Sequence, residues 1–117
     1  MSFWRDEVIE YALDQETLRH IREQMEWIAC EPRNPKPYYH LAMLYRMQWK
    51  QDEALGLLLE AVALDEGFAE AHVALSEMYA VRGDYRAAWR HARSAAAAGD
   101  TRAAELLTRY SVAEPAE

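Results

Sequence analysis

The sequence predicts an all-α fold in which antiparallel helical hairpins stack side by side, and three observations lead to it. Ala, Leu, Glu and Arg dominate the 117 residues, whereas Gly and Pro number only 4 each, and this composition favours helices. Apolar residues recur at the i, i+3, i+4, i+7 spacing of one helix face. The same residue types also recur 34 positions apart, a spacing that we call the repeat period, and such self-similarity is the signature of a repeat architecture.

The repeat is clearest between residues 35–68 and residues 69–102. In each of these units two apolar helix faces flank a short polar turn, so each unit is predicted to be one helical hairpin. Identical residues occupy equivalent positions in one unbroken register: Leu41 and Leu75, Tyr45 and Tyr79, Ala54 and Ala88, and Ala61 and Ala95.

Turn residues divide the chain into its predicted elements. Gly83 and Gly99 are expected to end helices, because glycine readily adopts the left-handed conformation that closes a helix. Trp49 stands where the second unit has Gly83, so a distorted turn is expected there. Residues 111–117 are expected to be a disordered tail. Seven helices are predicted, at residues 3–13, 15–30, 36–48, 51–64, 69–82, 85–98 and 101–110, and the last of them caps the array.

Residues 1–34 are predicted to form a degenerate third helix pair. Trp4, Tyr11 and Pro32 fall on repeat positions when the period is counted back. Bulky His20 and Trp27 stand in this pair where the other units have small residues. We therefore expect it to pack differently, with an apolar stripe formed by Leu18, Ile21, Met25 and Ile28.

The motif L-[small]-x₂-Y, followed in the second unit by Gly-Asp-Tyr and in both units by A-x₆-A, resembles the tetratricopeptide repeat (TPR) of small bacterial-type TPR proteins. The sequence departs from the family at three places, since Trp49 replaces its turn glycine and Glu66 and Asp100 replace its closing proline. The resemblance implies a TPR-like α-solenoid, with small side chains where two helices cross closely and large ones filling the gaps. The small positions are Ala42, Ala54, Ala61, Ser76, Ala88 and Ala95.

Charge and cysteine content exclude several classes of protein. The formal net charge of −7 disfavours binding to nucleic acid and to anionic membranes. The single cysteine, Cys30, cannot form an internal disulfide, which fits a reducing compartment, and it is expected to pack as a small hydrophobe. The N-terminus lacks the pattern of a signal peptide, and no apolar run is long enough to span a membrane. A soluble cytoplasmic protein is therefore expected.

The sequence contains no catalytic motif. There is no Gly-rich phosphate loop, no H-E-x-x-H, no Cys pair and no G-x-S-x-G. We therefore expect no enzyme activity, no cofactor and no metal site. The histidines lie on different predicted helices and are expected to have structural or surface roles; they are His20, His40, His72 and His91.

The helix predicted at residues 36–48 carries a second apolar line, formed by Tyr39, Met43 and Met47, beside its core face. In the TPR family the first helices of successive units line a concave groove, so the resemblance implies that these positions contact a peptide. Methionine adapts its shape to its partner, so an apolar or amphipathic peptide is expected. Alternatively, Met43 and Met47 pack beneath residues 1–34. The predicted groove residues are Lys36, Tyr39, Met43, Arg46, Met47, Val73, Glu77 and Val81.

These features predict a protein–protein interaction adaptor or scaffold. The family's clamp for a C-terminal carboxylate is not expected, because Tyr39 and Met43 replace its Lys and Asn. The alternative is a self-association module that forms homo-oligomers, since residues 1–34 are acidic and residues 69–102 are slightly basic. Trp49 and Phe68 are either exposed aromatics or fold back onto a neighbouring unit. The basic line is either a self-association surface or a solvated convex face; it consists of Arg82, Arg86, Arg90 and Arg93.

Overall fold

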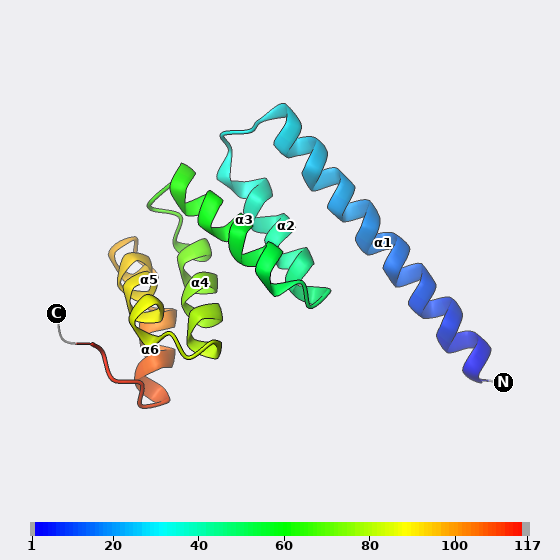
Figure 1. Ribbon diagram of the computed structural model, residues 1–117. Coiled ribbons are helices and arrows are strands. Elements are labelled where there is room, and N and C mark those ends of the chain that lie inside the picture. The colour runs from blue at the N-terminus through cyan, green and yellow to red at the C-terminus, as the bar shows by residue number, and fades with distance from the viewer. Residues whose placement is uncertain (1, 116–117) are drawn as a thin grey trace.

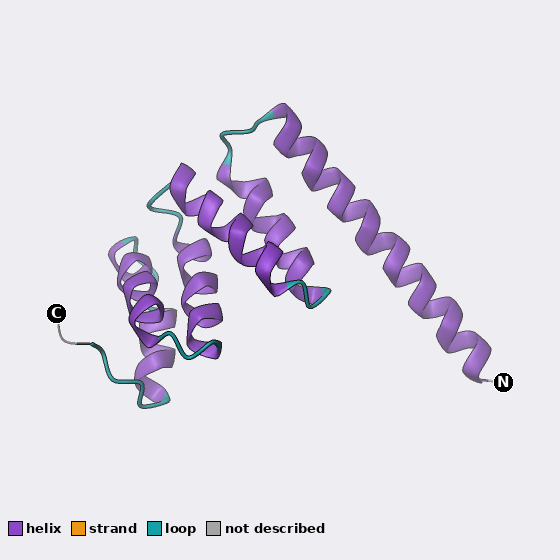
Figure 2. Ribbon diagram, in the orientation of Figure 1, coloured by secondary structure: helices purple, strands orange, loops and turns teal. Residues whose placement is uncertain are grey.

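The chain is helical along most of its described length. The computed structural model describes the backbone of residues 2–115 and the side chains of residues 14–115. Within these residues it contains six helices and no strand, which confirms the all-α prediction (Figures 1 and 2). None of the described helices is both long and apolar enough to cross a membrane. The helices are α1 (Ser2–Cys30), α2 (Pro35–Met47), α3 (Gln51–Leu64), α4 (Ala69–Val81), α5 (Tyr85–Ala97) and α6 (Arg102–Arg109).

Each helix packs against the helix that follows it in the sequence. Contacts join α1 to α2, α2 to α3, α3 to α4, α4 to α5 and α5 to α6, and α4 also contacts α6. The result is an elongated stack of 56 × 38 × 22 Å, with α1 at one end and the α5–α6 pair at the other (Figure 1). Neighbours in space are therefore largely neighbours in sequence.

The helix bounds themselves follow the repeat period of the sequence. Helix α4 begins and ends one period after α2, and α5 begins one period after α3. The predictions for these four helices are confirmed to within one residue at each end. Side chains cap two of them: Asn34 accepts a hydrogen bond from the Lys36 N–H at 3.0 Å, and Asp84 accepts one from the Ala87 N–H at 3.1 Å.

The prediction of seven helices is wrong, because residues 3–13 and 15–30 belong to one continuous helix, α1. The expected turn at Asp14 is absent, and the backbone stays helical from residue 14 to residue 16. No Gly or Pro interrupts this segment, and Asp14, Gln15 and Glu16 all tolerate a helix interior. The side chains of Trp4 and Tyr11 lie outside the described residues.

Four helices end in the same hydrogen-bonded closure. After α2, for example, the Lys50 N–H donates to the Tyr45 carbonyl at 2.9 Å, and the Trp49 N–H donates to the Arg46 carbonyl at 3.0 Å. The turn at Trp49 is therefore not distorted, contrary to the prediction, although a left-handed conformation there costs about 1–2 kcal/mol. Each closure contains one residue with positive φ. After α2, α4, α5 and α6 in turn, these residues are Trp49 (62°), Gly83 (81°), Gly99 (99°) and Ser111 (59°).

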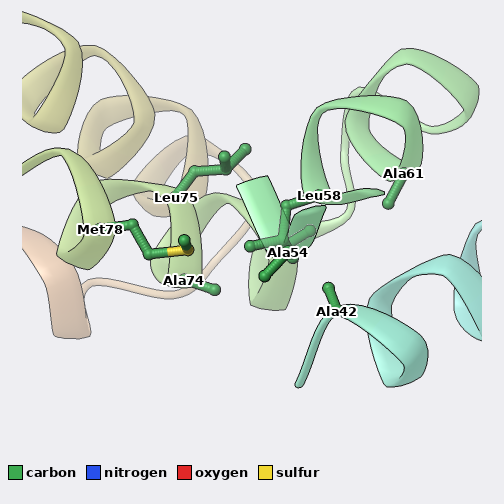
Figure 3. Packing of buried hydrophobic residues seen from close by; sticks show 8 residues of the cluster. Ala42, Ala54, Leu58, Ala61, Ala74, Leu75 and Met78 are labelled. Atoms are coloured by element: carbon green, nitrogen blue, oxygen red, sulfur yellow. The ribbon is translucent and has the colours of Figure 1, made fainter. Parts of the chain in front are cut away.

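Small residues form the places where helices approach most closely. The Ser76 hydroxyl donates a hydrogen bond to the Ala88 carbonyl at 2.8 Å, so this buried polar group is satisfied. The first core cluster joins α2, α3 and α4 and consists of Ala42, Ala54, Leu58, Ala61, Ala71, Ala74, Leu75 and Met78 (Figure 3). The second core cluster joins α4, α5 and α6 and consists of Val73, Ala88, Trp89, Ala92, Ala95, Ala103 and Leu107.

The segment after α6 packs onto the second core cluster, so the prediction of a disordered tail is wrong for residues 111–115. The Trp89 indole N–H donates to the Val112 carbonyl at 3.1 Å, and Val112 packs against the cluster. Arg93 also pairs with Glu114 at 2.6 Å. Residues 116–117 lie outside the described residues.

The inner face of α1 differs from the predicted stripe. Ile21 is buried and Ile28 is half-buried, but Leu18 and Met25 are exposed at 44% and 47%. Cys30 is also exposed, which corrects the expectation that it packs as a small hydrophobe. Helix α1 therefore meets the rest of the molecule along a narrow contact with α2.

Candidate functional site

The residues predicted to contact a peptide lie on α2 and α4, at positions related by the repeat. Tyr39 and Val73 are one repeat period apart, and so are Met43 and Glu77. An ion pair of 3.8 Å between the Arg46 guanidinium and the Glu77 carboxylate links the two helices. We call this surface the α2–α4 face and define it by Lys36, Tyr39, Met43, Arg46, Met47, Glu70 and Glu77.

Tyr39 forms the boundary between α2 and α4 on this face. Its half-buried ring lies 5.5 Å from the Phe68 ring and 5.5 Å from the His40 ring, measured between centroids. Burial raises the pKa of Tyr39, and the negative charge of Glu70 raises it further. Phe68 therefore folds back onto α2, and Tyr39 presents a neutral phenol.

The two methionines of the face have different surroundings. Met47, at the end of α2, is 70% exposed. Met43 is half-buried, packs against the first core cluster and lines a cleft of about 370 Å³ between α1 and α2. The alternative prediction was that both methionines pack beneath residues 1–34. It is confirmed in part for Met43 and is wrong for Met47. We call this cleft the α1–α2 cleft; it is lined by His20, Gln24, Trp27, His40, Met43 and Leu44.

The two valines predicted for the groove have different surroundings. Val73 is only 7% exposed because it belongs to the second core cluster with Ala103 and Leu107 of α6. Its prediction as a contact residue is wrong, since α6 covers it. Val81 is 89% exposed at the end of α4, beside Arg82.

The face is divided into shallow hollows of mixed charge rather than one apolar groove. Lys36 and Glu70 line a hollow of about 440 Å³ together with His40 and Phe68. Glu77 lines another, of about 280 Å³, where α4 meets α6. A ligand on this face therefore meets basic and acidic side chains in alternation, with Met43 and Met47 between them.

Helix α6 contributes residues that the sequence analysis assigned only to a cap. Arg102, Glu105 and Arg109 line the 280 Å³ hollow beside Glu77. Asp100 pairs with Arg102 at 2.6 Å, and hydrogen bonds from Arg102 hold the pKa of that carboxyl below its usual value. The signal was present in the sequence, because these charged residues alternate with the inward Ala103 and Leu107 at helical spacing.

The sequence analysis also missed a buried histidine pair. Nδ1 of His72 lies 3.0 Å from Nδ1 of His91, and Nε2 of His72 lies 2.8 Å from the Glu66 carbonyl oxygen. An Nε2–H on His72 donates to that carbonyl, and the two Nδ1 atoms share one hydrogen bond. Burial and the neighbouring His72 lower the pKa of His91 to about 4, so the His91 ring is neutral near pH 7.

A further hollow lies on the opposite side of the stack, between α3 and α5. Its volume is about 610 Å³, and His72 forms part of its wall. Small residues at the end of α5 leave this space opposite larger residues of α3. The lining comprises Leu59, Val62, Ala63, Glu66, Gly67, His72, Ser94, Ala97 and Ala98.

The arginines of the predicted basic line are partly used within the chain. Arg82 pairs with Asp52 at 2.7 Å and ties α4 to the start of α3, and Arg93 pairs with Glu114. These pairs neutralise both ends of the line, so its charge is less available for self-association.

Across residues 14–115, no group of three or more His, Cys, Asp and Glu side chains is placed to hold a metal ion. No protein-family model matches this sequence, and no curated protein matches it.

Proposed function

We propose that the chain is a TPR-type α-solenoid and works as an adaptor that binds a short amphipathic peptide on the α2–α4 face. The helix bounds that follow the repeat period, and the alanines buried where α2, α3 and α4 cross, support the solenoid. In this proposal the chain recognises a protein partner and catalyses no reaction.

One observation carries the proposal: an exposed methionine stands beside a weak ion pair that crosses from α2 to α4. Met47 is 70% exposed, so its side chain is accessible to an apolar ligand. The Arg46 and Glu77 side chains are 31% and 39% exposed, and their separation of 3.8 Å makes the pair weak. Apolar contact and charge recognition are therefore available within one helical turn.

The charges indicate what kind of peptide fits. An acidic side chain of the peptide competes with Glu77 for Arg46, while an adjacent apolar side chain contacts Met43 and Met47. Lys36 at the start of α2 offers a second positive charge at the other end of the same helix. The preferred ligand is therefore a peptide that combines one or two apolar residues with an acid.

The test begins with an array of 12-residue peptides that vary in apolar content and charge, probed with the full chain. The best binder is then labelled and titrated by fluorescence anisotropy. The Arg46→Ala/Met47→Ala double variant is expected to weaken binding at least tenfold, the scale of an interface hot spot. Glu77→Gln is expected to tighten binding of acidic peptides, because it removes the competing carboxylate.

The matched control is Leu59→Ala, which removes a partly exposed leucine from α3, outside the α2–α4 face. It is expected to leave the affinity unchanged. Equal affinities for the double variant and the unmodified chain would show that the peptide binds elsewhere.

A further inference from the structure

The α1–α2 cleft corresponds to a packed interface one repeat later in the chain. The α1 residues that line this cleft are His20, Gln24 and Trp27. The three residues that lie one repeat period after them are all members of the first core cluster. The two residues that lie one repeat period after His40 and Leu44 of α2 are members of that cluster as well. The five equivalents are Ala54, Leu58, Ala61, Ala74 and Met78, which are at most 4% exposed. The open cleft is thus the repeat equivalent of a closed core.

The helix that closes this core has its own equivalent in the sequence. Helix α2 closes the first core cluster with Ala42, which is fully buried, and with Tyr38 and Tyr45, which pack against it. Counting back one repeat period from these three positions gives Trp4, Val8 and Tyr11. The backbone of residues 2–13 is helical, but it continues straight from α1 and extends past the other helices (Figure 1). The segment that the repeat assigns to the cleft therefore lies outside it.

Two observations indicate that a helix belongs in the cleft. The Oε1 atom of Gln24 is buried without a hydrogen-bond partner, and such atoms normally have one. Residues 3–13 are also rich in apolar residues, and helices in proteins gain most of their stability by packing an apolar face. The apolar residues of this segment are Phe3, Trp4, Val8, Ile9, Tyr11, Ala12 and Leu13.

Residues 2–13 could fill the cleft of their own molecule only if the chain reversed its direction at residues 14–16. The chain does not reverse there, because α1 is continuous. Residues 14–16 are the equivalents of residues 48–50, where the chain reverses with Trp49 at positive φ. A helix in the cleft must also lie farther from α1 than α2 lies from α3, because the bulkier His20 and Trp27 replace Ala54 and Ala61. A three-residue turn joins helices that pack closely, so it does not suit a wider separation. A helix from another molecule is free of that restriction.

We propose that two copies of the chain exchange residues 2–13, so that this part of α1 lies in the α1–α2 cleft of the second copy. The larger side chains at positions 4 and 8, compared with Tyr38 and Ala42, fill the wider interface. The exchange is reciprocal, so it closes into a symmetric dimer and does not propagate into a fibre. The inference goes beyond peptide binding on the α2–α4 face. The two sites share Met43, whereas Met47 and the Arg46–Glu77 pair lie outside the cleft.

The test places one cysteine on each side of the exchanged interface. Val8→Cys and His20→Cys, in a Cys30→Ser background, are the equivalents of the buried Ala42 and Ala54. In a straight helix these positions are about 18 Å apart along the axis, so one α1 cannot bridge them. After mild oxidation at micromolar concentration we expect a covalent dimer on a non-reducing gel. A disulfide within a monomer, or none, would overturn the proposal.

The matched control pairs Val8→Cys with Arg22→Cys, since Arg22 is exposed and does not line the cleft. It is expected to give no covalent dimer. The Cys30→Ser chain provides a second readout that no cysteine can disturb: light scattering after size exclusion should give twice 13.6 kDa. A monomer at every concentration would rule out the exchange.

Discussion

The two ends of the stack differ in how completely their helices are packed, although the repeat period relates their sequences. Seven of the 13 residues of α4 are buried, and α4 contacts α3, α5 and α6. Between residues 14 and 30 of α1, only Ile21 is buried. The difference shows that a repeat motif fixes helix positions, whereas stability depends on which neighbours cover each helix.

The largest effect is expected where the contrast in burial is greatest. Leu75 is fully buried in α4, so Leu75→Ala should reduce the free energy of unfolding by about 3 kcal/mol. Leu18→Ala is the matched change on α1, and its exposed side chain should contribute less than about 0.5 kcal/mol. Urea denaturation of both variants measures the difference. Similar losses at the two sites would mean that α1 is covered in solution.

The second prediction concerns pH and belongs to the α4–α5 end alone. The pKa of His91 is lowered to about 4, so between pH 6.5 and 4 the unfolded chain takes up a proton that the folded chain does not. The stability that this neutral ring contributes is therefore complete above pH 6.5 and is lost as the pH falls to 4. The loss amounts to about 3 kcal/mol.

Urea denaturation at pH 7.5 and pH 4.5 checks this prediction. His72 and Arg90 are the groups that lower the pKa of His91 besides burial, and Tyr79 stacks on its ring at 5.6 Å. His91→Phe keeps an aromatic ring but cannot titrate, so its stability should fall less over the same range. Carboxylates affect both proteins alike and cancel in the comparison. An equal fall in the two proteins would assign the pH dependence to other groups.

The smallest effect is expected at the turn between α2 and α3. Trp49 is 86% exposed and has a φ of 62°, so Trp49→Gly relieves backbone strain and removes little packing. The variant should raise the free energy of unfolding by about 0.5–1 kcal/mol. This value is the relieved backbone strain minus the conformational entropy that glycine adds to the unfolded chain. Gly83→Ala makes the reverse change after α4 and should be destabilising. If Trp49→Gly lowers stability, then the indole makes a contact that favours the folded chain.

The hairpins were predictable because their signals are local. Periodic apolar residues and turn residues such as Gly83 lie within the segments they define, and the helix bounds from residue 35 to residue 97 follow them closely. The continuity of α1 was not predictable from residues 14–16, which suit either a helix or a turn. That choice depends on how His20 and Trp27 pack, which is a property of the whole N-terminal region.

The candidate site was predictable only in part, for a similar reason. The repeat register placed Tyr39, Arg46 and Glu77 together on neighbouring helices, as the structure has them. Val73 occupies an equivalent position but is buried, because α6 docks over it. His72 and His91 are 19 residues apart on separate helices, so their contact appears only once α4 and α5 are packed.

The position of α4 has a consequence for the order in which the chain folds. Its contacts run to helices close by in sequence, so they form with little loss of loop entropy, and proteins rich in such contacts fold fast. Because α4 bridges both core clusters, the transition state for folding should contain α4 with α3 or α5 already docked. The N-terminal part of α1 joins last, so it is the first segment to become accessible to proteases and hydrogen exchange.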